Sequence, residues 1–151
     1  MTKLLEWLRI TLVILAFFMI HLKPPSQGLF WLVALMVLPL TGLTAVESLF
    51  FAKEAALAKK WDKGSPYQIQ SGLNNLAVAL TAIIVLAFNL NQQAQVTICL
   101  VALIFFALSS LNHIRAYFID KSVGIHLQRF ILTIFLWVSS APILYSAIKI
   151  H

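Results

Sequence analysis

The sequence predicts an all-α integral membrane protein, a single domain built as a bundle of five transmembrane helices. The first observation is composition: 61% of the 151 residues are hydrophobic and only 11% are charged, against about 25% charged in soluble domains. The second is that apolar stretches long enough to cross a hydrocarbon core, about 20 residues each, recur along the chain. No alternation of the outer-membrane barrel type is present. We expect spans at about 4–22, 29–52, 66–90, 94–119 and 127–148.

The limits of the first two spans follow from helix-breaking residues. The first ends before Pro24 and Pro25, which cannot continue a helix. We expect it to be retained as an uncleaved span, because no small-residue cleavage site follows Ile20. The second contains Pro39, which predicts a kink. Its helix is expected to continue past the bilayer through residues 52–63, which are rich in Ala, Lys and Glu.

The last three spans are separated by polar connections. The third begins at Pro66, a residue favoured at the first position of a helix. It carries a stripe of small residues suited to close helix contact, namely Gly72, Asn75, Ala79 and Ala82. The fourth follows the polar, uncharged segment 89–95, and the fifth follows a cytoplasmic connection.

The distribution of basic residues predicts the orientation. With five spans, the N-terminus and two of the loops share one side of the membrane. Nine basic residues belong to that side: Lys3, Arg9, Lys53, Lys59, Lys60, Lys63, Arg115, Lys121 and Arg129. The other side carries only Lys23 and Lys149. The bias places the N-terminus in the cytoplasm and the C-terminus outside a bacterial inner membrane.

Several functional classes are excluded or unsupported. The net charge of +6 comes from too few basic residues to follow a nucleic acid backbone. Cys99 is the only cysteine, so the chain has no internal disulfide and no cysteine pair. The sequence contains no catalytic motif, and no residue pattern in it identifies a cofactor. We expect no metal site, because His113 and His126 lie inside and His21 and His151 outside, without ligand spacing.

The remaining polar residues gather in the cytoplasmic half of the spans. Glu6 and Arg9 lie there on the first span. On the fourth, Ser109, Asn112 and His113 share one helix face through their i, i+3, i+4 spacing. If the bundle buries these faces, polar groups from several spans converge near the cytoplasmic mouth. The candidate pocket residues are Glu47, Asn75, Asn112, His113 and Arg129.

Different interpretations of this cluster are open. The structural one is that Asn75, Asn112 and His113 hydrogen-bond the helices together, while Glu47 and Arg129 lie at the interface or form an ion pair. The functional one is a pocket for a small amphipathic ligand, a quinone or a lipid headgroup. In that pocket Glu47 is the acceptor, His113 the titratable donor, and Asn75 and Asn112 the orienting groups.

Two further classes of protein remain as alternatives. One is a small oligomeric transporter or channel, which the almost bare outer half of the bundle disfavours. The other is a structural subunit of a larger membrane complex. The lipid bilayer is the expected partner in every case, with a second copy or another membrane protein as further candidates.

One segment resembles a known family. Residues 61–68, Trp-Asp-Lys-Gly-Ser-Pro-Tyr-Gln, precede Gly72 and Asn75-Leu76, and His113-Ile114 follows later. This pattern resembles an uncharacterised family of small bacterial membrane proteins, which is loosely similar to DoxX-like four-helix proteins. Gln70 stands where the family pattern has Glu, and Asn112 where it has Gly. The resemblance implies a four-helix core plus one helix, and a link to quinone-linked or thiol redox complexes.

Overall fold

The computed structural model describes residues 1–59, 66–119 and 124–149, and these are almost entirely helical. In chain order the elements are α1 (Thr2–Leu22), α2 (Pro25–Leu32), the π-helical turn η1 (Val33–Val37), α3 (Leu38–Phe50), α4 (Ala52–Lys59), α5 (Pro66–Ala87), α6 (Gln92–Ile119) and α7 (Gly124–Lys149). Among the described residues, five helices are long and apolar enough to cross a membrane. The predicted all-α architecture is therefore confirmed, and five helices have the length and composition that a membrane span needs.

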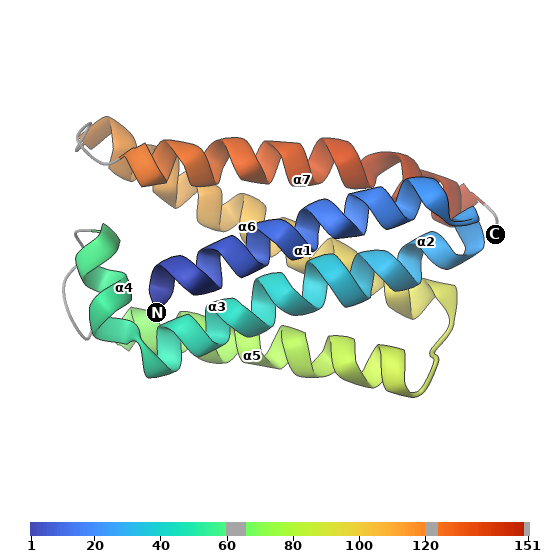
Figure 1. Cartoon of the computed structure of the whole chain (residues 1–151), viewed down its shortest axis with the longest axis horizontal. Helices are drawn as coiled ribbons and strands as arrows, with labels where there is room; N and C mark the ends of the chain where they lie inside the picture. Colours follow the sequence, from blue (N-terminus) through green and yellow to red (C-terminus); the bar gives the residue numbers. More distant parts are fainter. Residues whose placement is uncertain (60–65, 120–123, 150–151) are drawn as a thin grey trace.

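The five spans run along one long axis, with the N-terminus and the last described turn of α7 at opposite ends (Figure 1). The N-terminus, α4 and the start of α5 lie together, and we call this the N-terminal end of the bundle. α2, η1 and α3 follow one another as a single span. The arrangement puts the polar half of each predicted span at the N-terminal end.

Small residues allow α3 and α5 to pack closely, and this is one of the two most extensive helix contacts in the bundle. A Cβ atom added at Gly72 would lie 2.9 Å from Leu49 Cδ2. Asn75, Ala79 and Ala82, which continue the stripe along α5, are all buried. The predicted stripe is therefore a real contact surface, because it lets two backbones approach without side chains between them.

The span that contains Pro39 is irregular just before the proline. Residues 33–37 form a wide π-helical turn, in which the Leu38 N–H bonds to the Val33 carbonyl five residues back. A proline crowds the carbonyl four residues before it and lacks an N–H, so a wider turn at this point relieves the crowding. The irregularity predicted at Pro39 thus takes the form of a π-helical turn.

The predicted continuation of the second span as one unbroken helix is wrong, although residues 52–59 are helical as expected. The helix ends at Phe50, and Phe51 leaves the helical conformation with φ −119° and ψ 28°. α4 then starts in a new direction (Figure 1). The Gln68 side chain donates a 2.9 Å hydrogen bond to the Ala52 carbonyl at this break. Ala55 and Ala56 are buried, so α4 keeps the helical conformation that its composition favours but packs these alanines against the rest of the chain. Residues 60–65 lie outside the described residues.

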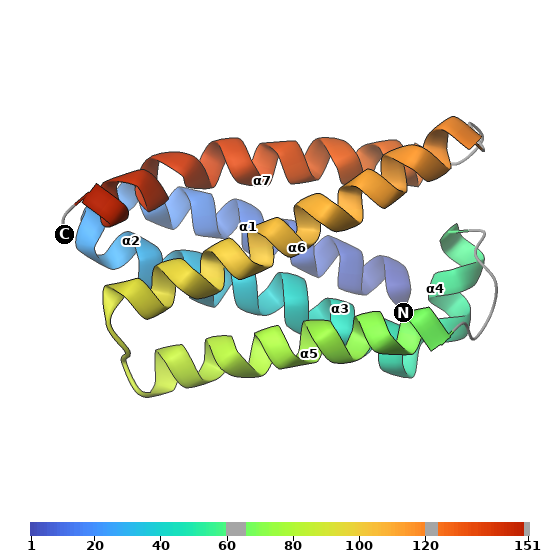
Figure 2. The ribbon, with the colours of Figure 1, turned by 180° about the vertical axis from the view of Figure 1, so that it is seen from behind.

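α6 crosses the bundle obliquely. Figure 2 shows it starting near the end of α5 and running towards α7 at the N-terminal end. It packs extensively on α7 and much less on α5. The main apolar core lies in the half away from the N-terminus, around Leu32, Met36 and Leu103. At the N-terminal end, the divergence of α6 from α5 accompanies the cavity described next.

Candidate functional site

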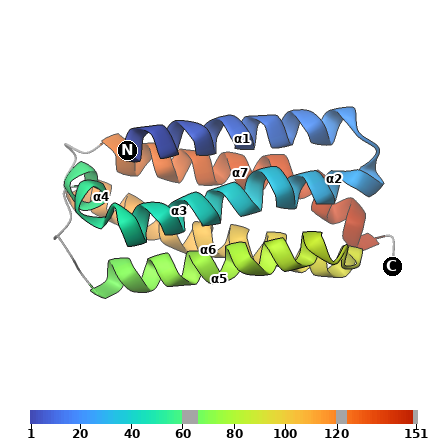
Figure 3. The ribbon, with the colours of Figure 1, turned by 60° about the horizontal axis from the view of Figure 1, so that its bottom comes forward.

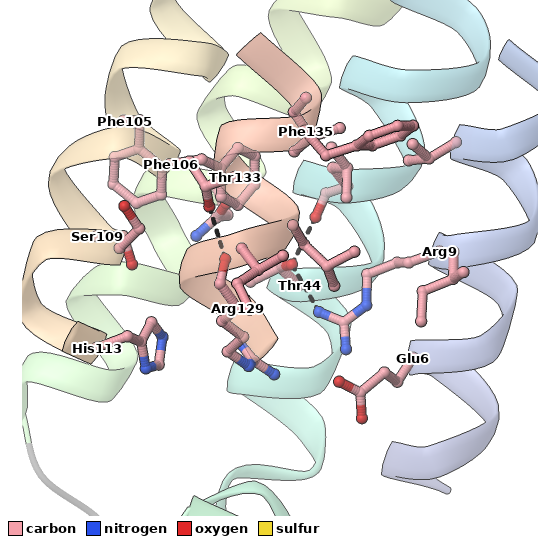
Figure 4. Close-up of a pocket in the computed structure, with 18 of the residues that line it drawn as sticks. Glu6, Arg9, Thr44, Phe105, Phe106, Ser109, His113, Arg129, Thr133 and Phe135 are labelled. Atoms are coloured by element: carbon pink, nitrogen blue, oxygen red, sulfur yellow. Dashed lines mark hydrogen bonds between the residues drawn. The ribbon is translucent and has the colours of Figure 1, made fainter. Parts of the chain in front are cut away.

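A cavity of about 490 Å³ lies in the N-terminal half of the bundle, and all five spans line it. One part of its wall is apolar, with Val13, Phe105, Phe106 and Phe135 among the lining residues. The polar lining residues are Glu6, Arg9, Thr44, Ser48, Gln68, Ser71, Asn75, Ser109, Ser110, Asn112, His113, Arg129 and Thr133. Figure 4 shows how side chains from different helices turn towards this space.

Four of the five residues predicted for the pocket line this cavity. They are Asn75, Asn112, His113 and Arg129, and Ser109 joins them from the same face of α6. Glu47 does not belong to the lining. It is buried behind the wall, with only 3% of its surface exposed. The convergence expected from depth and helix face is therefore present for all but Glu47.

Glu47 forms a buried ion pair with Arg9 of α1. The Arg9 Nη2 atom donates to Glu47 Oε2 at 2.7 Å, and Nη1 donates to the Thr44 hydroxyl at 2.9 Å. The third nitrogen, Nε, donates to the Leu5 carbonyl at 3.3 Å. Each nitrogen of the guanidinium thus has an acceptor, and the two charges compensate each other.

An ion pair between Glu47 and Arg129 was one of the expectations from the sequence, and the structure pairs Glu47 with Arg9 instead. A usable signal was present, because an arginine inside a span needs a buried counter-charge. Within the predicted spans the sequence has only two acidic residues, Glu6 and Glu47. Glu6 precedes Arg9 by three residues on the same helix, which leaves Glu47 as the carboxylate that can join two helices.

The Arg129 guanidinium has no hydrogen bond or ion pair in the part of the chain that the structure describes. Its Nε atom is buried without an acceptor. The charges that act on it are those of Glu47, Arg9 and Glu6, and none of these groups forms an ion pair with it. In Figure 4 Arg129 lies between His113 and Arg9, with Glu6 beside Arg9. The cavity therefore contains a cation whose charge is not matched by a direct partner.

Asn75 contributes the complementary polar atom. Only 1% of its surface is exposed. Its Nδ2 atom donates to the Ser71 carbonyl at 2.8 Å, whereas Oδ1 is buried with no donor in the described residues. The cavity thus combines a donor without an acceptor, at Arg129, with an acceptor without a donor, at Asn75.

His113 and His126 contact each other across the α6–α7 interface. Their Nδ1 atoms are 2.8 Å apart, and both side chains are buried. Because one ring nitrogen must donate and the other accept, the pair shares a proton. From the sequence both histidines are expected on the same side of the membrane, but not in contact with each other. The signal was their position at the end of one span and the start of the next.

No group of three or more potential metal-ligating side chains occurs in the described ranges. His113 and His126 alone provide two nitrogens.

These features define the class: a multi-span membrane protein with an internal polar cavity at one end of an apolar helical bundle. The chain belongs to DUF6790, a family of unknown function, whose model matches residues 6–145. No curated protein and no solved structure matches the chain. The DoxX-like resemblance stays a prediction. Of the motif that carries it, residues 61–65 lie outside the described ranges, while Gln68 and Asn75 are buried.

Proposed function

We propose that this protein binds a small amphipathic ligand in the cavity between its five spans, with the N-terminal end facing the cytoplasm of a bacterial inner membrane. The observation that carries the proposal is the cavity itself. Its volume of about 490 Å³ falls within the roughly 300–1,000 Å³ of small-molecule pockets. Its lining combines aromatic side chains with a few polar groups, which is typical of such pockets.

The unpartnered polar atoms support this proposal. A buried donor or acceptor without a partner costs about 1–3 kcal/mol, and more when the group is charged. Arg129 Nε and Asn75 Oδ1 are both in this condition, and both residues line the same cavity. A ligand that accepts from one and donates to the other removes the penalty.

The roles of the residues differ from those expected for a quinone or lipid headgroup. Glu47 acts through Arg9, which it neutralises and positions, since it does not reach the cavity surface. Asn75 is the acceptor, and Arg129 and His113 are donors to the ligand. A quinone as occupant would make the protein a redox accessory.

The transporter alternative is disfavoured by the half of the bundle away from the N-terminus. The described residues there form a continuous apolar core. Trp137 of α7 donates to the Leu103 carbonyl of α6 at 3.2 Å and helps to close this core. A polar solute would cross this region without groups to replace its hydration.

The orientation is tested by labelling single cysteines in a Cys99→Ser background. Glu54 on α4 and Gln93 at the start of α6 are both exposed and lie at opposite ends of the bundle. We expect Gln93→Cys to react with an impermeant maleimide on intact spheroplasts, and Glu54→Cys to react only after permeabilisation. The reverse pattern would overturn the orientation.

Ligand binding is tested by extracting the protein directly from its membrane into native nanodiscs and identifying bound small molecules by mass spectrometry. Ser109→Phe places a ring in the cavity, and Thr97→Phe places one on an exposed position of the same helix. We expect a molecule that co-purifies with the wild type and Thr97→Phe and is lost from Ser109→Phe. Identical small-molecule contents in all three would refute the proposal.

A further inference from the structure

We propose that the ligand is an acidic amphiphile whose carboxylate or phosphate head binds Arg129 and whose tail leaves the cavity between α1 and α7 into the bilayer. The inference rests on the proposed function and specifies the class of ligand and its direction of entry. Two independent observations carry it: the uncompensated charge and the position of the cavity rim.

The charge balance points to an anion. Arg9 is neutralised by Glu47 at 2.7 Å, which leaves Arg129 and Glu6 as the other charged lining residues. Glu6 is partly exposed and lies about 6 Å from the start of α1, at 1.5 Å per residue. There it is within reach of water and lipid headgroups. Arg129 is half-buried and its Nε atom is buried without an acceptor, so Arg129 is the cation that lacks a partner among the described residues that line the cavity.

The geometry of a guanidinium favours an oxyanion over a neutral carbonyl. Its planar fork matches carboxylate and phosphate oxygens with two parallel hydrogen bonds. A quinone carbonyl accepts a hydrogen bond but leaves the charge unmatched. Asn75 Oδ1, the other unpartnered atom, accepts from a hydroxyl or N–H near the head of the ligand.

The apolar part of the cavity rim lies on α1 and α7, and the exposed Asn112 forms a polar part of the rim on α6. Three lining residues on α1 and α7 are strongly exposed: Ile14 at 60%, Ile131 at 55% and Phe135 at 50%. Their neighbours Val13 and Leu136, which also line the cavity, are buried. Apolar side chains that border both the cavity and the outer surface mark the place where the cavity opens sideways.

The packing of α1 allows this opening. α1 packs on α2, η1 and α3, and its backbone hardly approaches α7. Figure 3 shows α1 at the edge of the bundle, with α7 behind it. The side chains of Phe17 and Phe135 meet edge to face, with ring centroids 5.4 Å apart. This contact closes the gap between the two helices on the side away from the N-terminus.

The depth of the opening places it in hydrocarbon. Ile14 is about 18 Å along α1 and Phe135 about 16 Å along α7, at 1.5 Å per residue. Both positions are near the middle of a hydrocarbon core of about 30 Å. Arg129 is about 8 Å along α7, close to the depth of lipid headgroups. A ligand with its head at Arg129 and its tail towards Phe135 has the orientation of a lipid in the same leaflet.

The head-group requirement is tested on the wild-type protein in nanodiscs of phosphatidylcholine. Oleate, oleyl phosphate, methyl oleate and oleyl alcohol compete for the site against a fluorescent fatty acid. We expect the two acids to compete at least tenfold better than the two neutral molecules. Stronger competition by oleate identifies a carboxylate ligand, and stronger competition by oleyl phosphate identifies a phosphate ligand. Equal competition by all four would overturn the inference.

The role of Arg129 is tested by three variants. Arg129→Gln should weaken oleate or oleyl phosphate binding about tenfold to a hundredfold, as expected for loss of a charged hydrogen-bonding partner. Arg129→Lys keeps the charge but lacks the planar guanidinium, and its affinity for the same ligands should lie between those of Arg129→Gln and the wild type. Arg115→Gln removes an exposed arginine of α6 that does not line the cavity, and it should stay within about twofold of the wild type.

The remaining outcomes separate this inference from the proposed function. If Ser109→Phe abolishes binding while Arg129→Gln has no effect, the pocket binds a ligand but the acidic head is refuted. If Ser109→Phe also leaves binding unchanged, both proposals fail. A fatty acid with a diazirine in mid-chain should crosslink to α1 and α7 near Ile14 and Phe135. Crosslinks confined to α3 and α5 would overturn the lateral route.

Discussion

The ion pair between Arg9 and Glu47 should be a major determinant of stability, and a double-mutant cycle measures it. The two groups are 2.7 Å apart, and their side chains are only 8% and 4% exposed. At an effective dielectric constant of about 20, their attraction is about 6 kcal/mol before desolvation is subtracted. Removing one partner of a buried pair costs about 3–5 kcal/mol, because the other charge stays buried without compensation.

We therefore expect Glu47→Gln and Arg9→Met each to lower the free energy of unfolding by about 3–5 kcal/mol. The double variant should lose about 2–3 kcal/mol less than the sum of the two single variants, which is the coupling energy of the pair. The measurement is reversible unfolding in mixed micelles by titration with sodium dodecyl sulfate, followed by tryptophan fluorescence.

Glu54→Gln is the matched control. Its ion pair with the N-terminus is more than half exposed, and its loss should cost less than about 1 kcal/mol. A coupling energy below about 0.5 kcal/mol would show that the two charges act independently and refute this reasoning.

Two further predictions concern helix contacts. Gly72→Ala should destabilise the bundle by about 1–3 kcal/mol through overpacking, since its Cβ would meet the Leu49 side chain at 2.9 Å. Gly124→Ala, where nothing lies within 4 Å, should be close to neutral in the same unfolding assay; equal effects would contradict the close α3–α5 approach. His113→Ala and His126→Ala should be non-additive by about 0.5–1.5 kcal/mol, because either change removes the same buried hydrogen bond. Strict additivity would show that the bond contributes nothing.

The spans were predictable because the bilayer imposes a length and a composition on every crossing helix. The predicted limits of the first, fourth and fifth spans lie within a few residues of α1, α6 and α7. The residue at which the helix of the second span ends was not predictable. Ala, Lys and Glu favour a continuing helix, but propensity alone does not describe the hydrogen bond from Gln68 to Ala52 that forms at the break. That bond depends on where α5 returns to the bundle.

The depth of the candidate site residues along their helices was predictable from the sequence, but their interaction partners were not. Counting residues along a helix gives the depth of Asn75, Asn112, His113 and Arg129, and all four line one cavity. It does not give the rotation of each helix about its axis. That rotation decides that Glu47 turns to Arg9 rather than to Arg129.

The two arginines inside the spans differ in a way that separates stability from binding. Seven other basic residues still lie on the predicted cytoplasmic side, against two on the opposite side, so the topology does not need Arg9 or Arg129. Arg9 is compensated within the protein, whereas Arg129 is not. Removing an uncompensated buried donor is stabilising when no ligand is present, so Arg129→Met should raise the free energy of unfolding by about 1 kcal/mol in neutral lipid.

Oleate or oleyl phosphate at a hundred times its dissociation constant should then stabilise the wild type by about 2.7 kcal/mol and leave Arg129→Met unchanged. The two proteins would therefore exchange their order of stability when the acid is added. A variant that is less stable than the wild type without ligand would show that Arg129 has a structural partner. In that case its buried charge would be explained by the fold, and the reason for placing an acidic head beside it would be lost.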